Sequence, residues 1–149
     1  VPGLYGYVSA TKWLTAIELT DWDADGYWIP RGWAKKGPIK TQSRIDVPRP
    51  GTKIPGGRQP IAGVAWAPTR GIERVEVSID GGRWMEATLA AALDVDAWRQ
   101  WFLPWEPTPG RHVIAVRATD GLGEVQTDER TPVAPDGAAG RHSIEVVVV

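Results

Sequence analysis

Hydrophobic and polar residues alternate along several segments in the second half of the chain, and this alternation predicts β-strands. In the stretch ERVEVSI, residues 73–79, the side chains of Val75, Val77 and Ile79 fall on one face, and charged or polar residues fall on the other. A period of two with one apolar face is typical of a half-buried strand. The other segments that we expect to form strands are residues 61–66, 98–105, 111–120 and 142–149.

Turn signals separate these strands at the spacing of an all-β domain. Asp80-Gly81-Gly82 favours a tight hairpin, because its glycines accept positive φ, and residues 83–89 then form the return strand. A short turn of helix is expected over residues 90–93. Together these elements predict an all-β, immunoglobulin-like (E-set type) β-sandwich over residues 39–149.

The first 38 residues differ in character from the rest of the chain. They are rich in aromatic residues and in loop-forming residues, with one plausible strand at residues 12–19 (KWLTAIEL). Residues 35–60 are rich in proline and glycine, so we place a domain boundary near residue 38, which separates residues 1–38 from the sandwich. The chain begins with Val1, and its first residues resemble mid-domain sequence. We therefore expect a fragment of a longer protein.

Composition excludes several classes of function. The formal net charge of −1 over 149 residues provides no basic field for nucleic acid. No apolar run approaches the roughly 20 residues needed to span a bilayer. The absence of cysteine excludes a disulfide framework, a thiolate metal site and a cysteine nucleophile within these residues. There is also no G-x-S-x-G elbow, and the glycine turns lack the pattern of a phosphate-binding loop.

Acidic and histidine residues provide two candidate metal sites. Asp21, Asp23 and Asp25 have the spacing of a calcium loop, but Gly32 stands where the twelfth, bidentate ligand would fall. An acidic surface turn is therefore the favoured interpretation. His112 and His142 lie far apart, each at the start of an expected strand, and polar residues at strand edges account for them without a metal.

Nine tryptophans stand out against one phenylalanine. Trp22, Trp28 and Trp33, in the loop-rich segment, are candidates to stack on a sugar or another flat ligand. An autonomous tryptophan-rich sandwich that binds carbohydrate or protein is therefore one hypothesis for the function. For the tryptophans on expected strands the core is the better prediction, and these are Trp66, Trp84 and Trp101.

Several motifs, in one order through nearly the whole chain, resemble the C-terminal part of the sulfite oxidase family of molybdopterin-dependent oxidoreductases. VPGLYGYVSATKWL is similar to the last segment of that family's cofactor-binding domain, and KTQSRIDVPRPG resembles the link to the next domain. The most specific part is W-x-x-x-x-G-I-x-x-V-E-V-S-x-D-G-G, within residues 66–82. AWRQWFLPWEPTPGRHVIAVRATDGLGEVQ and DGAAGRHSIEV are similar to the later strands.

The resemblance implies that residues 39–149 are the family's dimerisation domain, which pairs two subunits in many members. The parent protein would be an oxidoreductase of the oxygen-atom transfer type, with a small oxyanion or oxide as substrate. In the family, molybdenum is held by the pterin dithiolene and by a cysteine of the preceding domain, and this chain has no cysteine. The fragment alone is therefore expected to bind no cofactor and to have no redox activity.

Individual residues carry over from the resemblance. The family's cofactor contacts include the stretch that is Ala10-Thr11-Lys12 here. Sulfite oxidases place a tyrosine near the metal, and the aligned stretch offers Pro30 instead, which puts sulfite itself in doubt as the substrate. The candidate catalytic residues in the parent are Tyr27, Arg31 and Arg130.

The leading hypothesis is thus a C-terminal fragment that supplies subunit pairing and one edge of the cofactor site. Its expected partners are a second copy, through the immunoglobulin-like domain, and the upstream molybdopterin-binding domain of the same chain. The segments GYVSATKWL and GYWIPRGWAKKGPIKTQSRID resemble bacterial members of the family, some of which follow a membrane-anchoring region. This resemblance implies an extracytoplasmic catalytic part in the parent protein.

Overall fold

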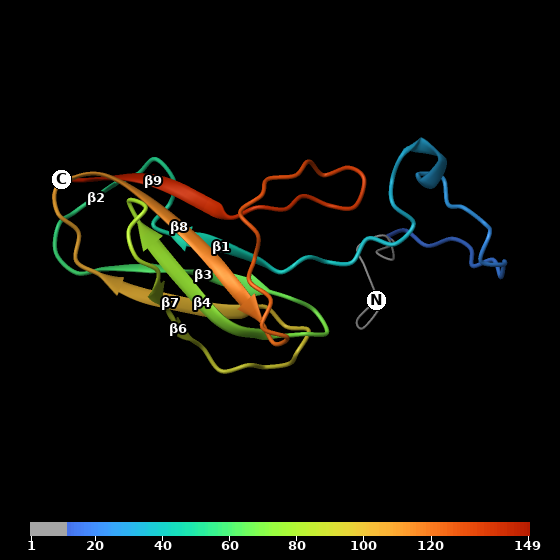
Figure 1. The fold of residues 1–149 in the computed structure, drawn as a ribbon, viewed down its shortest axis with the longest axis horizontal. Coiled ribbons are helices and arrows are strands. Elements are labelled where there is room, and N and C mark those ends of the chain that lie inside the picture. The colour runs from blue at the N-terminus through green and yellow to red at the C-terminus, as the bar shows by residue number, and fades with distance from the viewer. Residues whose placement is uncertain (1–11) are drawn as a thin grey trace.

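The strands of this protein form a two-layer β-sandwich (Figure 1). The structure, a computed structural model, describes residues 12–149. The strands are β1 (Gln42–Val47), β2 (Lys53–Ile54), β3 (Gln59–Trp66), β4 (Ile72–Ile79), β5 (Met85–Glu86), β6 (Thr88–Leu89), β7 (Arg99–Trp105), β8 (Gly110–Asp120) and β9 (His142–Val148).

One sheet has the strand order β1-β3-β7-β6, and the other has the order β2-β9-β8-β4-β5. Neighbouring strands are antiparallel except β2 and β9, which run parallel. The predicted all-β sandwich is confirmed. Every segment that was expected to be a strand from residue 61 onward contains one, and only residues 83–89 depart from the expected form.

The core lies between the two sheets and uses the apolar positions of the alternating segments. In β4 the buried residues Val75 and Val77 alternate with Arg74 and Glu76, which face outward. Full burial of each such side chain stabilises the fold by about 1.5–3 kcal/mol. The larger side chains that are buried completely are Ile61, Val75, Val77, Ile114, Val116 and Val146.

Residues 83–89 form two short strands in different sheets, so the prediction of one return strand was wrong in form. β5 pairs with β4, whereas β6 pairs with β7 in the opposite sheet. The chain crosses at Ala87, which is buried and whose N–H donates to the Val75 carbonyl at 2.8 Å. The helical turn expected over residues 90–93 is absent, because this stretch instead connects β6 to β7.

β1 and β2 lie in the proline- and glycine-rich stretch where no strand was expected. β1 pairs with β3 along residues 42–47, and this pairing depends on a close approach of the two backbones at Gly63. A Cβ atom at Gly63 would lie 1.8 Å from the carbonyl oxygen of Arg44, so no larger residue fits without displacing β1.

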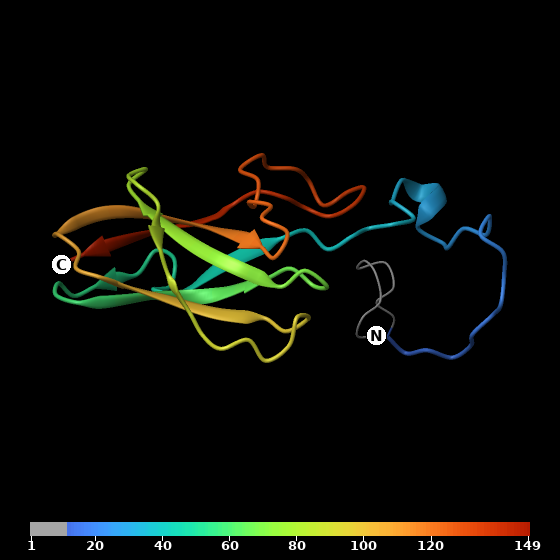
Figure 2. The ribbon, with the colours of Figure 1, turned by 60° about the horizontal axis from the view of Figure 1, so that its bottom comes forward.

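Residues 12–41 lie outside the two sheets, beyond the end of the sandwich that is opposite the C-terminus (Figures 1 and 2). The strand predicted over residues 12–19 is not formed. A strand needs a hydrogen-bonded neighbour, and no described residue provides one here. The one regular element in the described part of this segment is a 3₁₀ turn, η2 (Ile29–Arg31).

The tryptophans divide between the core and the surface. Trp101 is 2% exposed and packs in the core, as predicted. The core prediction was wrong for Trp66 and Trp84, which are half-buried. Trp66 alternates with the buried Ala65, so it faces outward and packs against Trp98 at a centroid distance of 5.8 Å.

Candidate functional site

A cleft of about 580 Å³ opens where residues 38–43 enter the sandwich. Its other wall is the long connection between β8 and β9, which projects from the sandwich beside the incoming segment (Figure 1). Trp66, at the end of β3, contributes an aromatic side chain to the lining. Residues from three distant parts of the sequence therefore build one concave surface.

The charge of this cleft is positive. Lys40, Arg130 and Arg141 line it, and no aspartate or glutamate is among the described residues that do so. Lys40 Nζ donates to the Asp136 carboxylate at 3.2 Å and to the Gly137 carbonyl at 2.7 Å. These contacts hold Lys40 against the connection between β8 and β9, and a cationic lining suits an anion.

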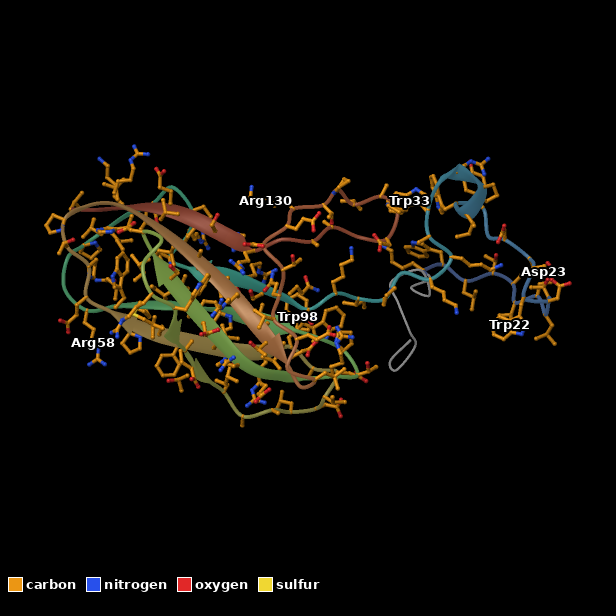
Figure 3. All side chains as sticks on the ribbon, in the orientation of Figure 1. Trp22, Asp23, Trp33, Arg58, Trp98 and Arg130 are labelled. Atoms are coloured by element: carbon orange, nitrogen blue, oxygen red, sulfur yellow. The ribbon has the colours of Figure 1, made fainter. Side chains whose placement is uncertain are left out.

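The arginines of the cleft are less completely paired. Arg141 Nη1 lies 3.4 Å from the carboxylate of Asp128, which is mostly exposed. Arg130 is exposed and forms no ion pair with any residue that the structure describes (Figure 3). Two buried polar atoms in the lining, Thr131 Oγ1 and Arg141 Nε, have no hydrogen-bond partner among the described residues. The cleft thus retains hydrogen-bonding groups that residues 12–149 leave without a partner.

His142 contributes a neutral imidazole to the cleft. The backbone N–H of Ile45 donates to His142 Nδ1 at 3.0 Å, so the ring proton sits on Nε2. Burial lowers the pKa of His142 below its ordinary value of 6.5, and the nearby Arg44 charge lowers it further. At neutral pH this side chain is therefore an uncharged donor beside the three cations.

A buried ionic network fixes the incoming segment below the cleft. Asp120 is fully buried, and its Oδ2 accepts from Thr41 Oγ1 at 2.7 Å and from Arg70 Nε at 2.9 Å. Its Oδ1 accepts from the backbone N–H groups of Leu122 and Glu124. Burial raises the pKa of Asp120, but these four donors outweigh it and leave the pKa below 3.8.

Hydrogen bonds also hold the backbone of the incoming segment, residues 34–41. Arg70 Nη2 donates to the Ile39 carbonyl at 3.0 Å, and the Ala34 N–H donates to the Pro135 carbonyl at 2.9 Å. The chain between residues 34 and 41 is therefore held from two sides. Sequence reasoning identified Arg130 in this region but missed Lys40, Arg141 and the Asp120 network, because none of them forms a local motif.

The other candidate residues do not meet at this cleft. Ala10 and Thr11 lie outside the described residues, and Lys12 is exposed without a hydrogen bond to any described residue. Tyr27 and Arg31 do lie together. Arg31 stacks 3.6 Å from the Tyr27 ring centroid and donates to the Tyr27 carbonyl at 2.6 Å.

Two of the three carboxylates of the acidic turn, those of Asp21 and Asp25, have partners within the described chain. Asp21 Oδ1 accepts from the backbone N–H groups of Asp23 and Ala24 at 3.1 Å each, and Asp25 pairs with Lys35 at 2.9 Å. Within residues 12–149, no group of three histidine, cysteine, aspartate or glutamate side chains is arranged to hold a metal ion. In the same range, no helix is long and apolar enough to cross a membrane.

The architecture and the cleft together define an immunoglobulin-like β-sandwich with a basic site at one end. No family model matches the chain. The chain is 29% identical to sulfite oxidase of Gallus gallus over 157 aligned residues. This alignment covers 89% of the present chain and 34% of that protein. The sulfane dehydrogenase SoxCD of Paracoccus pantotrophus superposes with a TM-score of 0.59 and 26% identity. This superposition covers 71% of the present chain and 30% of that one.

The resemblance to the C-terminal part of the sulfite oxidase family is therefore confirmed. The chain spans about a third of the length of each of these two relatives. Residues 42–149 alone are too few to make up the 89% that matches sulfite oxidase, so the match extends into the N-terminal segment.

Proposed function

We propose that this chain is the C-terminal part of a molybdopterin-dependent, sulfite oxidase-like oxidoreductase. The observation that carries the proposal is the double match, in sequence to a sulfite oxidase and in structure to a sulfane dehydrogenase. Because the chain corresponds to about a third of each relative, it would act together with a cofactor-binding domain supplied by the rest of the polypeptide.

The residues of this chain do not fit a complete molybdopterin site. The sequence contains no cysteine to ligate the metal, and Lys12 lies exposed outside the cleft lining. Ala10, Thr11 and Lys12 would contribute one edge of a site whose other contacts lie elsewhere. We therefore expect that the 149-residue chain binds no cofactor and has no redox activity by itself.

The basic cleft would bind the substrate. Two relatives are named for sulfur compounds, a sulfite oxidase and a sulfane dehydrogenase, and three cationic side chains line the cleft. Both observations support a small oxyanion as the ligand. Arg130 is the best candidate to contact it, because Lys40 is paired with Asp136 and Arg141 lies near Asp128. Arginine suits an oxyanion, since its planar donors form two parallel hydrogen bonds.

A full-length protein made in a host that supplies molybdenum cofactor tests the proposal. We expect about one molybdenum per subunit by elemental analysis, and none in the 149-residue chain purified from the same host. We expect Arg130→Ala to raise the KM for sulfite or a related oxyanion by at least about tenfold with molybdenum content unchanged, because the charge-assisted hydrogen bonds of the guanidinium to the oxyanion are lost.

Arg58→Ala is the matched control, because Arg58 is exposed and lies next to the start of β3, whereas the cleft lies at the end of β3 (Figure 3). A full-length protein without molybdenum would refute the proposed function. Equal KM values for the two variants would remove Arg130 from the substrate site.

Pairing of two subunits through the sandwich is the second part of the proposal. The outer face of the β1-β3-β7-β6 sheet carries Phe102, which is 48% exposed, above a groove of about 360 Å³ that Ala62 and Val64 also line. We expect Phe102→Asp to shift the protein from dimer to monomer in sedimentation velocity. Val113→Asp, on a similarly exposed position of the other sheet, should leave the dimer intact. A wild-type monomer would contradict the pairing.

A further inference from the structure

The N-terminal segment carries large apolar side chains that nothing in the described chain covers. Ile17 is 82% exposed and Leu19 is 97% exposed, and Leu14 is also mostly exposed. Single exposed apolar residues are ordinary on a protein surface, but a short run of them marks a contact surface. These residues therefore require a partner that the sandwich does not provide.

The order of the residues specifies the form of that contact. From Leu14 to Thr20 the sequence is LTAIELT, in which Thr15, Ile17 and Leu19 lie on one face of an extended chain. Leu14, Ala16, Glu18 and Thr20 lie on the opposite face, so the two faces differ in polarity from Ile17 onward. β-branched and other apolar residues at most positions favour a strand, and its C-terminal half has one apolar and one polar face.

The backbone of the same residues has no hydrogen-bond partner among the residues that the structure describes. No hydrogen bond joins residues 14–20 to any described residue, whereas the sandwich strands pair throughout their lengths. Trp13 adopts a φ of 57°, a left-handed conformation that ends the extended run on its N-terminal side. Residues 14–20 thus combine main-chain groups that have no described partner with residue types that favour a strand.

The sandwich of the same chain does not supply that neighbour. Residues 12–38 lie beyond one end of the sandwich in both views (Figures 1 and 2). The grip on residues 34–41 directs the segment away from the sheets. In addition, the sequence match to sulfite oxidase extends into the N-terminal segment, so part of this segment is shared with a relative about three times longer than this chain.

We propose that residues 14–20 form a β-strand by adding to the open edge of a sheet in the cofactor-binding domain of the full-length protein. This inference rests on the proposed function, because that function supplies the domain. Main-chain hydrogen bonds to the sheet edge would hold the strand, and Ile17 and Leu19 would fill apolar pockets on one face. Glu18 would stay in solvent on the other face.

Amide hydrogen exchange on the full-length protein tests the strand. We expect at least alternate amides between residues 14 and 20 to exchange about 100-fold more slowly than in the 149-residue chain, because an edge strand pairs through every second residue. Ile17→Asp should abolish this protection, and Glu18→Lys, which changes charge on the opposite face, should preserve it.

Ile17→Asp should leave the melting temperature of the 149-residue chain unchanged, because Ile17 is 82% exposed and no hydrogen bond joins residues 14–20 to the sandwich. If Ile17→Asp prevents the full-length protein from folding, the milder Ile17→Ala and Leu19→Ala variants should each reduce the protection measurably.

A protein that holds molybdenum but exchanges residues 14–20 without protection would overturn the strand addition and leave the proposed function standing. A protected strand in a protein without molybdenum would refute the proposed function alone. Self-association of the 149-residue chain that Ile17→Asp abolishes would assign the segment to a second copy, and would also overturn this proposal.

Discussion

The sandwich and the N-terminal segment differ in whether their apolar side chains are buried and their backbone groups are hydrogen-bonded. In the sandwich, Val75, Val77 and Ile114 are fully buried, and the backbone groups pair within the two sheets. In the segment, Ile17 and Leu19 are exposed and the backbone of residues 14–20 has no described partner. The sandwich therefore buries its own core and pairs its own strands. Residues 14–20 would form a strand only beside the edge of another sheet.

The junction between these regions is polar and is centred on one buried carboxylate, that of Asp120. Asp120, Arg70 and Thr41 tie the incoming backbone to the sandwich, and Lys40 does the same on the other side of the chain. A buried ion pair fixes the relative positions of the groups that it joins, but it adds little to the free energy of unfolding, because the cost of desolvation offsets much of the attraction. The network therefore serves to fix the direction in which the segment leaves the sandwich, next to the basic cleft.

The contrast between the two regions predicts the largest effect for tryptophan removal. Trp101→Ala should lower the free energy of unfolding by about 3–5 kcal/mol, because it empties a large volume of the core. Trp22→Ala should change it by less than about 0.5 kcal/mol, because Trp22 is 93% exposed. Urea unfolding of both variants, followed by circular dichroism, measures the difference. Similar losses would mean that the segment packs on the sandwich.

Removal of the junction carboxylate should rank second. Asp120→Ala leaves the Arg70 guanidinium, Thr41 and two backbone N–H groups without their acceptor, and should cost about 3 kcal/mol. Asp128→Ala is the control, since its pairing with Arg141 is mostly exposed and should be worth less than about 1 kcal/mol. Thermal and chemical unfolding of the two variants compare these costs, and equal losses would contradict the structural role of Asp120.

The smallest effect is a dependence of stability on pH at His112. Its Nδ1 lies 2.7 Å from Asp80 Oδ2 and its Nε2 lies 2.8 Å from the Thr108 carbonyl, so both ring nitrogens face acceptors. The hydrogen bond with Asp80, and then that with Thr108, raises the pKa of His112 above its ordinary 6.5. Its contribution is thus fully present below pH 6.5, and is lost as the pH rises through the raised pKa.

We expect this loss to be about 1 kcal/mol, because the Asp80 side chain is half exposed and solvent screens the pair. Unfolding measured between pH 6 and pH 9 should show the decline in wild type and not in His112→Gln. His142→Gln should keep the decline, since the pKa of His142 is lowered below its ordinary 6.5, whereas the decline occurs as the pH rises above 6.5. A decline that persists in His112→Gln would assign it to another group.

Local pattern was sufficient where each residue's environment follows from its immediate neighbours. The alternation in residues 73–79 and 111–120 predicted β4 and β8, because an inward-facing position in a strand recurs every second residue. The residues of the segment 12–19 also suggested a plausible strand, which does not form in the described chain. A pattern specifies the faces of a strand but cannot supply the neighbour that pairs with it.

The sequence by itself thus determined the all-β class, most of the strands, the buried faces and the family resemblance, since these depend on residue type and local order. Only the tertiary structure decided that β5 and β6 enter different sheets, and that β1 pairs against Gly63. It also brought Lys40, Arg130 and Arg141 into one cleft over the Asp120 network. These features depend on contacts between residues that are distant along the chain, and such contacts leave no periodic signal in the sequence.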